Sequence, residues 1–489
     1  MRKSAFLALI LVLVLTLSSC SIIVKDQAVD DSTPIITLGD TVINKKDFNE
    51  RVNTYLSEQA YFYSMYGYNL DVTDPQIITD AQNGVVSEFE ESTLRNVKLQ
   101  EWNLAELTEE DNAKIAAHLE EEMTGYRDEI KNYYITDKTL EGEALEAEID
   151  RQLEAFGINE DVIRPQVENE ILQEKFRAEV VKDAAVTEEE ITAKFNELVE
   201  SNKTTYEGKA GSWASAFNNG STLYYTPEGV RMVKQILVKY TDEDQAVLDQ
   251  INNDLIGGAF NDYYAAMSSL SYLGITDYTD AVNAITVTVT PSEEVTGEYY
   301  TGAVTTEYNA DALDPAIPEE QKELYIQMAV SQAVQDFYTD ELNKARAVAR
   351  THIDAEADDI LAQLEAGADW DTLMAEKTQD PGMQGDAPTA VTGYAVAADM
   401  TGFDTAFVDG AMAIANVGEV SGKIAGEQYG YYIIKYVADA VAGTAELDQA
   451  ASDSIRETVL TDKQNTLYSE TIAQWISEAG FKVDLNALK

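Results

Sequence analysis

The chain has 489 residues, 45% of them hydrophobic and 27 of them tyrosines, which excludes general disorder and indicates roughly two to four folded domains. Its net charge of −54 at pH 7 disfavours nucleic acid and anionic lipid headgroups as partners. Such a charge fits a soluble, self-repelling protein that handles aggregation-prone chains, and it fits equally an adaptation to a salty or cation-rich exterior.

The first twenty residues indicate an export signal. Two basic residues precede the apolar run Ala5–Leu17, which is shorter than the about 20 residues that span a membrane. The following sequence Leu-Ser-Ser-Cys20 resembles a bacterial lipobox, and Cys20 is the only cysteine of the chain, so it has no internal disulfide partner. We therefore expect residues 1–19 to be removed as a lipoprotein signal peptide. Cys20 then carries the lipid and holds the protein at the extracytoplasmic face of the cell membrane; a plain secretory cleavage site is the alternative.

A short polar tether, residues 20–33, is expected to lead into the first folded region. Two β-type runs, Ile35–Leu38 and Val42–Ile43, flank a Gly-Asp turn, and a helix then begins near Lys45.

Residues 80–200 are predicted to form successive helices. Thr108 and Thr187 each open a capping box, in which an acidic side chain follows three positions later. The side chains expected to form one buried stripe are Val86, Phe89, Val97 and Leu104. A cradle for unfolded chains and an ordinary helical domain would both show this pattern, and nothing in it indicates catalysis.

Strand-like segments return in the middle of the chain. Val230–Lys239 is predicted to be a strand, Ile285–Thr290 alternates with period two, and Val295–Tyr308 is β-prone and rich in tyrosine. A long helix is expected from Glu319 to about Ala349. The tyrosines of this region fit either a contact surface for unfolded chains or internal packing.

The next segment combines four elements. The amphipathic helix Asp354–Gly367 ends at a glycine, and the short helix Ala368–Glu376 carries an inward-facing tryptophan. The loop Thr378–Asp386 is dense in turn residues, and Tyr429–Tyr436 is a β-branched and aromatic strand. Residues 442–489 then close the chain with one long helix.

Together, the motifs ILVK, ILxxLxxGADW, QDPG, VGEVS and YGYYIIKY resemble the parvulin family of peptidyl-prolyl isomerases, in the form carried by PrsA- and SurA-type extracytoplasmic foldases. The resemblance implies an α+β protein with two parts. A mostly helical chaperone domain takes residues 34–225 and is completed by residues 442–489. A parvulin-like α/β domain takes residues 226–441 and is interrupted by an insert, residues 245–351.

The resemblance also implies a site for rotation about the peptide bond that precedes proline. Gln235 and Tyr432 stand where the family has two histidines, and Asp380 keeps the acidic position of the QDPG loop. The residues expected to cradle the proline ring are Phe403, Phe407 and Met412. These three fit equally the core of a helix. His352 is an alternative first histidine, although the chain from it to Gly367 is too short for both a strand and a helix. No metal or cofactor is expected, because the reaction breaks no covalent bond.

Three functions are compatible with these features. The first is a membrane-anchored foldase with parvulin-type isomerase activity, and the second is a chaperone in which the parvulin fold only binds. The third is a solute-binding lipoprotein, which would need two α/β lobes that the sequence pattern lacks. We favour the anchored chaperone or foldase, with its enzymatic activity undecided. The expected partners are unfolded or partly folded exported proteins and, through the lipid alone, the membrane; nucleic acid is excluded, and a homodimer is left open.

The lipidation of Cys20 can be tested directly. Cys20→Ser should release the protein from membranes into the medium or leave the precursor uncleaved, because no other thiol can accept the lipid. Intact-mass measurement of the mature N-terminus checks this, and a mature chain that starts elsewhere than Cys20 would contradict it.

Overall fold

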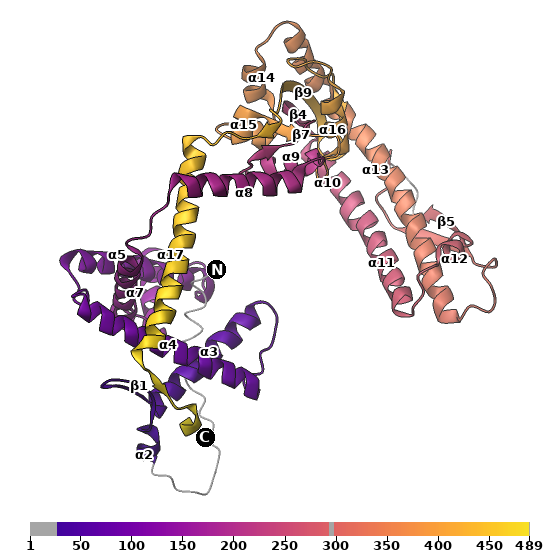
Figure 1. Cartoon of the computed structure of the whole chain (residues 1–489). Coiled ribbons are helices and arrows are strands. Elements are labelled where there is room, and N and C mark those ends of the chain that lie inside the picture. Colours follow the sequence, from indigo (N-terminus) through magenta and orange to yellow (C-terminus); the bar gives the residue numbers. More distant parts are fainter. Residues whose placement is uncertain (1–26, 293–297, 489) are drawn as a thin grey trace. The chain divides into compact units, whose positions relative to one another are not determined.

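The computed structural model describes residues 27–292 and 298–488 (Figure 1). The expected signal peptide, residues 1–19, and the lipidation candidate Cys20 lie outside the described residues. The described chain is mostly helical with small antiparallel sheets, which confirms the expected α+β class. Within those two ranges, none of the helices combines the length and the apolar character that a membrane span requires.

The chain divides into two compact units. The first comprises the chain up to Ile191 together with Ala450–Lys489, and the second comprises Thr192–Gln449. The sequence predicted the boundary between the helical and the parvulin-like domain at residue 225, which is two helices further along the chain than this division. The domain boundaries stay a prediction. The segment at 27–33 was expected to be part of a tether, and its residues Gln27–Asp31 form the short helix α2.

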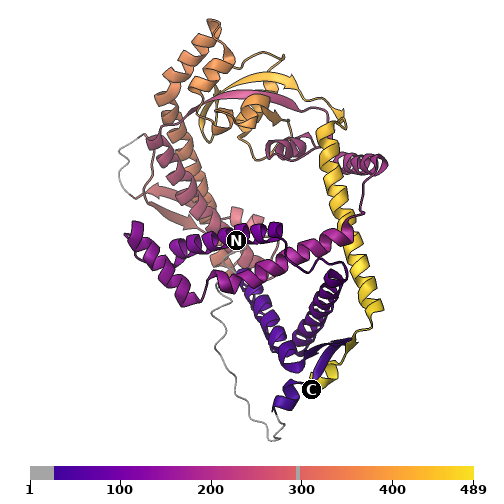
Figure 2. The same cartoon turned by 90° about the vertical axis from the view of Figure 1, so that its left-hand side faces the viewer.

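The first unit is closed by the C-terminal segment of the chain. Strand β1 (Pro34–Leu38) is the middle of a three-stranded antiparallel sheet, with β2 (Thr41–Asn44) on one side and β11 (Lys482–Val483) on the other. Both views show the C-terminus beside this sheet (Figures 1 and 2). Phe481 and Leu485 pack against the core that Ile35 and Ile36 build with the first helices.

Six helices and two short helical turns complete the first unit. They are α3 (Lys45–Met65), α4 (Pro75–Glu101), α5 (Glu109–Glu129), a π-helical turn (Ile130–Tyr134), α6 (Gly142–Phe156), α7 (Glu160–Val181), α17 (Gln449–Ala479) and a 3-10 turn (Leu485–Leu488). The Thr108 capping box is present at the start of α5, and Thr187 with Glu190 forms a second one before α8 (Glu188–Tyr206). Both capping predictions are therefore confirmed.

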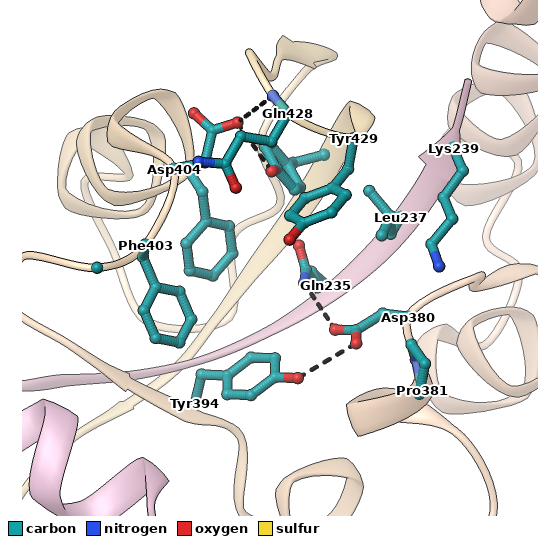
Figure 3. Close-up of a pocket in the computed structure, with 13 residues that line it drawn as sticks. Gln235, Leu237, Lys239, Asp380, Pro381, Tyr394, Phe403, Asp404, Gln428 and Tyr429 are labelled. Atoms are coloured by element: carbon teal, nitrogen blue, oxygen red, sulfur yellow. Dashed lines mark hydrogen bonds between the residues drawn. The ribbon is translucent and has the colours of Figure 1, made fainter. Parts of the chain in front are cut away.

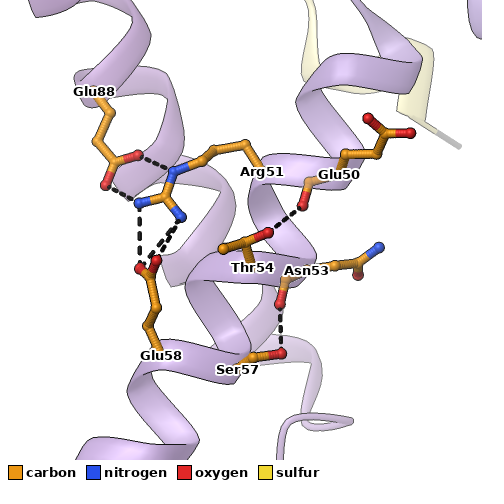
Figure 4. Close-up of polar contacts among 7 residues, drawn as sticks. All are labelled: Glu50, Arg51, Asn53, Thr54, Ser57, Glu58 and Glu88. Atoms are coloured by element: carbon orange, nitrogen blue, oxygen red, sulfur yellow. Dashed lines mark hydrogen bonds and ion pairs between the residues drawn. The ribbon is translucent and has the colours of Figure 1, made fainter. Parts of the chain in front are cut away.

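The buried face of α4 differs from the expected stripe. The buried aliphatic side chains of α4 are Ala81, Val85, Leu94 and Leu99. Of the four residues in the predicted stripe, Val86 and Phe89 are partly buried and pack against the core. Val97 is exposed, and Leu104 lies beyond the end of the helix, so the predicted stripe is confirmed only in its first half. A polar clamp joins α4 to α3: the Arg51 guanidinium donates to Glu88 on α4, at 2.8 and 2.9 Å, and to Glu58 on its own helix (Figure 4). Such bidentate pairs are stronger than single hydrogen bonds and fix the angle between two elements.

The second unit is built on a four-stranded antiparallel sheet. The strand order is β7 (Tyr394–Val396), β4 (Arg231–Lys239), β9 (Gly430–Asp439) and β8 (Ile424–Ala425). The two long strands in the middle pair over their whole length, from Arg231 opposite Asp439 to Lys239 opposite Gly430. They are the two strands predicted from the sequence, and both predictions are confirmed. β3 (Tyr225–Thr226) and β10 (Gly443–Thr444) form a separate small ribbon.

Helices cover both faces of this sheet. The helical elements of the second unit are most of α8, then α9 (Ala210–Asn218), α10 (Asp242–Asp249), a π-helical stretch (Gln250–Ile256), α11 (Gly257–Tyr272), α12 (Thr279–Asn283), α13 (Glu319–Glu365), α14 (Trp370–Lys377), a 3-10 turn (Pro381–Met383), α15 (Pro388–Thr392) and α16 (Thr405–Ala413). One core contains Ile236 and Ile433 with Trp370 of α14, and the other contains Leu237 and Ile434 with Trp213 of α9. The inward position expected of Trp370 is confirmed.

The insert is continuous with the sheet domain. Two helices were expected, one ending near Ala349 and one beginning at Asp354, but α13 runs unbroken through both. No glycine or proline lies between Ala349 and Asp354, and the buried Ile353 continues the apolar face, so nothing ends the helix there. The hairpin β5 (Thr286–Pro291) and β6 (Val304–Asn309) packs on the far part of α13, as the alternating pattern predicted.

Removal of residues 480–489 tests the closing role of the C-terminal segment. The deletion strips β11 from β1 and several apolar side chains from its core, so it should lower the unfolding temperature of the first unit by roughly 5–10 °C. Hydrogen exchange measures the effect locally. Amides of β1 should lose protection, those of β4 and β9 should not change, and unchanged β1 protection would contradict the prediction.

Candidate functional site

A cavity of about 360 Å³ opens in the second unit, on one face of the four-stranded sheet (Figure 3). Its volume is at the lower end of the range of small-ligand pockets, which suits a single side chain rather than a large molecule. Five of the six residues predicted from the sequence as catalytic or proline-binding line it: Gln235, Asp380, Phe403, Phe407 and Tyr432. They come from β4, the loop after α14, the segment before α16, α16 itself and β9.

The pairing of β4 with β9 brings Gln235 and Tyr432 to the same face. Gln235 lies opposite Ile434, and Leu237 lies opposite Tyr432. Side chains two apart on a strand point to the same side, so Gln235 and Tyr432 are diagonal neighbours across the two strands. Both side chains are buried, with 7% and 3% of their surface exposed.

Asp380 anchors the polar side of the cavity. Its carboxylate accepts hydrogen bonds from Gln235 Nε2 at 2.7 Å and from the Tyr394 hydroxyl at 3.2 Å (Figure 3). It also accepts the Gly382 backbone N–H at 2.9 Å. A Cβ on Gly382 would collide with the Tyr394 hydroxyl, so a larger residue here would have to displace that ring from Asp380. The loop is thereby fixed to the centre of β4.

The Gln235 amide has one unused polar atom. A carboxylate cannot donate, so the nitrogen of the amide must face Asp380 and the oxygen must point elsewhere. Gln235 Oε1 is buried and has no hydrogen-bond partner among the described residues. A buried acceptor without a donor is costly, and it is a place where a bound chain could supply an N–H.

Tyr432 is held by a second carboxylate. Its hydroxyl donates to Asp404 Oδ2 at 2.9 Å, and the same oxygen accepts the backbone N–H groups of Glu427 and Gln428 at 2.7 and 3.1 Å. Burial, with the neighbouring Asp404 carboxylate adding to it, raises the pKa of the Tyr432 phenol well above its usual value. Burial and then Asp380 raise the pKa of Tyr394 in the same way. Both phenols therefore stay protonated donors throughout the physiological pH range.

Aromatic rings form the apolar side of the cavity. Phe403 and Phe407 stack with their centroids 5.8 Å apart, Tyr394 meets Phe403 edge-on at 5.7 Å, and Phe407 meets Tyr432 edge-on at 5.3 Å. Phe407 is almost fully buried, whereas Phe403 is partly exposed and closer to solvent. The arrangement offers a flat apolar wall opposite a set of fixed polar groups, which can hold a small apolar ring beside an amide.

Two other residues considered from the sequence lie elsewhere. Met412 does not line the cavity; it packs at the edge of the core beneath α16, and its carbonyl accepts a hydrogen bond from Arg231 at 2.9 Å. His352 is on α13, half exposed, with its Nδ1 2.9 Å from the Asp244 carboxylate. The roles predicted for the site residues stay predictions.

Several lining residues were not found by sequence reasoning. Those with polar side chains are Lys239, Tyr394, Asp404, Gln428 and Tyr429. Asp404 carried a signal, because it precedes a helix start and caps α16 at Ala406 N. Tyr394 carried none: its strand has only three residues, and its place beside Asp380 is decided by the sheet.

Comparisons with known proteins add little to this geometry. No model of a protein family matches the chain, and no curated protein matches it. One similar solved structure is that of the foldase protein PrsA from Streptococcus pneumoniae str. Canada MDR_19A. It has 13% sequence identity, and the alignment covers 94% of this chain and 97% of that chain with a TM-score of 0.25. At that TM-score the likeness assigns neither a fold nor a function.

Asp380→Asn tests the polar anchor. The Asn amide keeps the shape of the carboxylate but replaces one accepting oxygen with an NH2 group, which would face an N–H or O–H donor. We therefore expect a loss of about 1–3 kcal/mol in the free energy of unfolding of the second unit. Urea denaturation measures it. The matched control is Asp409→Asn on the exposed side of α16, which should change stability by less than about 0.5 kcal/mol. Equal effects of the two substitutions would contradict the anchoring role.

Proposed function

We propose that this protein is an extracytoplasmic foldase, held at the membrane by a lipid on Cys20, whose second unit is a parvulin-type domain that binds proline-containing segments of unfolded chains. The first unit, closed by α17 and β11, is the chaperone part. The anchor rests on the lipobox-like sequence alone, and the parvulin assignment rests on the motifs together with the cavity.

One observation carries the proposal. The residues predicted for the site come from separate motifs, and Gln235 and Asp380 are 145 positions apart in the sequence. They nevertheless line one cavity, and a hydrogen bond joins Gln235 to Asp380. A chance resemblance of short motifs would not be expected to collect the polar and aromatic positions around the same small volume.

The cavity supports isomerisation mainly through its apolar wall. The barrier to rotation is the resonance of the amide, about 18–20 kcal/mol. A planar amide has more charge separation than a twisted one, so removing water from around it favours the twisted form relative to the planar form. Phe403 and Phe407 would hold the proline ring, and Gln235 Oε1 would accept an N–H of the client chain. We expect slow catalysis, because no histidine contributes.

A binding module without useful catalysis is the second candidate. The observation that favours it is that both replacing side chains already donate to carboxylates, Gln235 to Asp380 and Tyr432 to Asp404. The single proton of the Tyr432 hydroxyl is then used, and Gln235 keeps only its second N–H to polarise the carbonyl of a substrate. A solute-binding protein is less well supported, because the sheets of the described residues are small and antiparallel, not two lobes of parallel α/β structure.

The isomerase activity is tested by restoring the two histidines. With wild type, proline isomerisation in a short peptide should be slow and independent of pH from about 6 to 9, because the raised pKa values keep Tyr394 and Tyr432 protonated. Gln235→His with Tyr432→His should be faster, and its rate should change near pH 6.5, where histidine titrates.

Two controls separate the candidates. Phe403→Ala should slow isomerisation in both backgrounds and leave suppression of client aggregation unchanged, because broad apolar contacts hold an unfolded chain. A wild type as fast as the double variant would show that the histidine positions do not limit catalysis. No activity in either protein would leave the binding module as the function of the cavity.

A further inference from the structure

The arm of the second unit, residues 257–292 and 298–335, has a core of its own. Figure 1 shows α11 and α13 running side by side away from the sheet of β4 and β9. The buried side chains Ala266 and Leu270 of α11 face Met328 of α13, in a cluster separate from the two cores that flank the sheet. The arm is therefore a folded projection and not a loose loop.

One side of α11 carries an apolar stripe whose outer residues are exposed within the part of the second unit that the structure describes. Phe260 and Tyr264, one helical turn apart, are 48% and 44% exposed, and their rings lie 4.5 Å apart. Tyr263 and Met267 continue the stripe and are partly buried against the core of the arm. These four residues are called the α11 stripe below. Paired exposed aromatic rings give a large contact area at little cost in side-chain entropy.

The chain segment that contains the stripe is strongly acidic. From residue 240 to residue 321 the chain has sixteen Asp and Glu side chains and no Lys, Arg or His. The first basic residue after this interval, Lys322, lies 3.5 Å from Glu319 and is paired with it. Exposed carboxylates at Asp254 and Asp262 bracket Phe260 in the sequence. An apolar stripe thus lies in a strongly negative field.

The negative sign of this electrostatic field determines which partners the α11 stripe can bind. It repels nucleic acid, anionic lipid, acidic polypeptide and a second copy of this chain, whose own charge is −54. The field attracts a partner that carries positive charge, and the stripe can bind it if the partner also has apolar side chains. We propose that the α11 stripe binds basic segments of unfolded polypeptides that also carry aliphatic or aromatic side chains. The inference rests on the proposed foldase function, because it names the clients that such a protein would select.

Binding is tested on the full chain with unstructured, fluorescently labelled peptides that contain no proline, so that the cavity is not engaged. One peptide contains Lys with Leu and Phe, a second has each Lys replaced by Gln, and a third has each Lys replaced by Glu. Fluorescence anisotropy should show the cationic peptide binding about tenfold more tightly than the neutral one, and the acidic one not binding. Raising the salt from about 0.05 to 0.5 M should weaken only the cationic peptide. Equal affinities for the three peptides would overturn the proposal.

A matched pair of variants locates the site. Phe260→Ser with Tyr264→Ser should weaken binding of the cationic peptide about tenfold. The control is Phe62→Ser with Tyr66→Ser at the end of α3 in the first unit. This pair has the same residue types and spacing and is somewhat more exposed, with rings 5.2 Å apart. The control should bind as wild type, and an equal loss in both variants, or in neither, overturns the assignment to α11.

A second variant serves if the first is poorly folded. Asp254→Asn with Asp262→Asn keeps the shape of the arm and removes two charges, so it should weaken the cationic peptide and leave the neutral one unchanged. Isomerisation of a short proline peptide should be the same in all these variants. Loss of peptide binding with unchanged isomerisation would leave the proposal for the cavity intact. Charge-selective peptide binding by a protein without isomerase activity would leave the proposal for the stripe intact. Unchanged cationic binding in the Asn variant contradicts the role of the field.

Discussion

The antiparallel pairing of β4 with β9 is the constraint on which the second unit depends. It joins segments almost two hundred residues apart and fixes, by its register, which side chains share a face. If one strand slipped by one residue, Gln235 and Tyr432 would lie on opposite faces of the sheet, and the hydrogen bond of one of them to its carboxylate would break. The same pairing separates the two cores, because alternate residues of each strand enter one core or the other.

Carboxylates from outside the sheet hold the polar residues within it. Asp380 comes from a loop and Asp404 from the start of a helix, and each accepts a hydrogen bond from one buried sheet residue and at least one backbone N–H. Fully paired networks of this kind make a buried site rigid, whereas a single missing partner is costly. The cavity is thus a pre-formed space. Gln235 Oε1 is the buried side-chain atom of its lining that has no hydrogen-bond partner among the described residues.

The helix α13 connects the sheet domain to the arm. Its buried residues Leu342, Ala345 and Ala349 share a core with Ile236 of β4, while Tyr325 and Met328 belong to the core of the arm. An insertion between a strand and the following helix would ordinarily be tolerated as a loop. Here it extends the helix instead, so the arm is carried on a rigid element of the sheet domain.

The sequence by itself determined the elements whose signals are local. Turn residues, capping boxes and the run Gly430–Tyr436 placed the longer strands and several helix starts, because backbone preferences and side-chain periodicity act over a few residues. Where those signals were weak it failed: Val97 was wrongly placed in the buried stripe of α4, and the interval between Ala349 and Asp354 was taken as a break.

Tertiary structure decided what depends on contacts between distant segments. Tyr394 and Asp404 became site residues only through the sheet and the loop that bring them to the cavity, and Met412 was turned away from it. The continuity of α13 and the exposure of the α11 stripe likewise follow from which faces find a partner. Periodicity shows that a face is apolar, but burial is a property of what packs against it, and that information is spread over the whole chain.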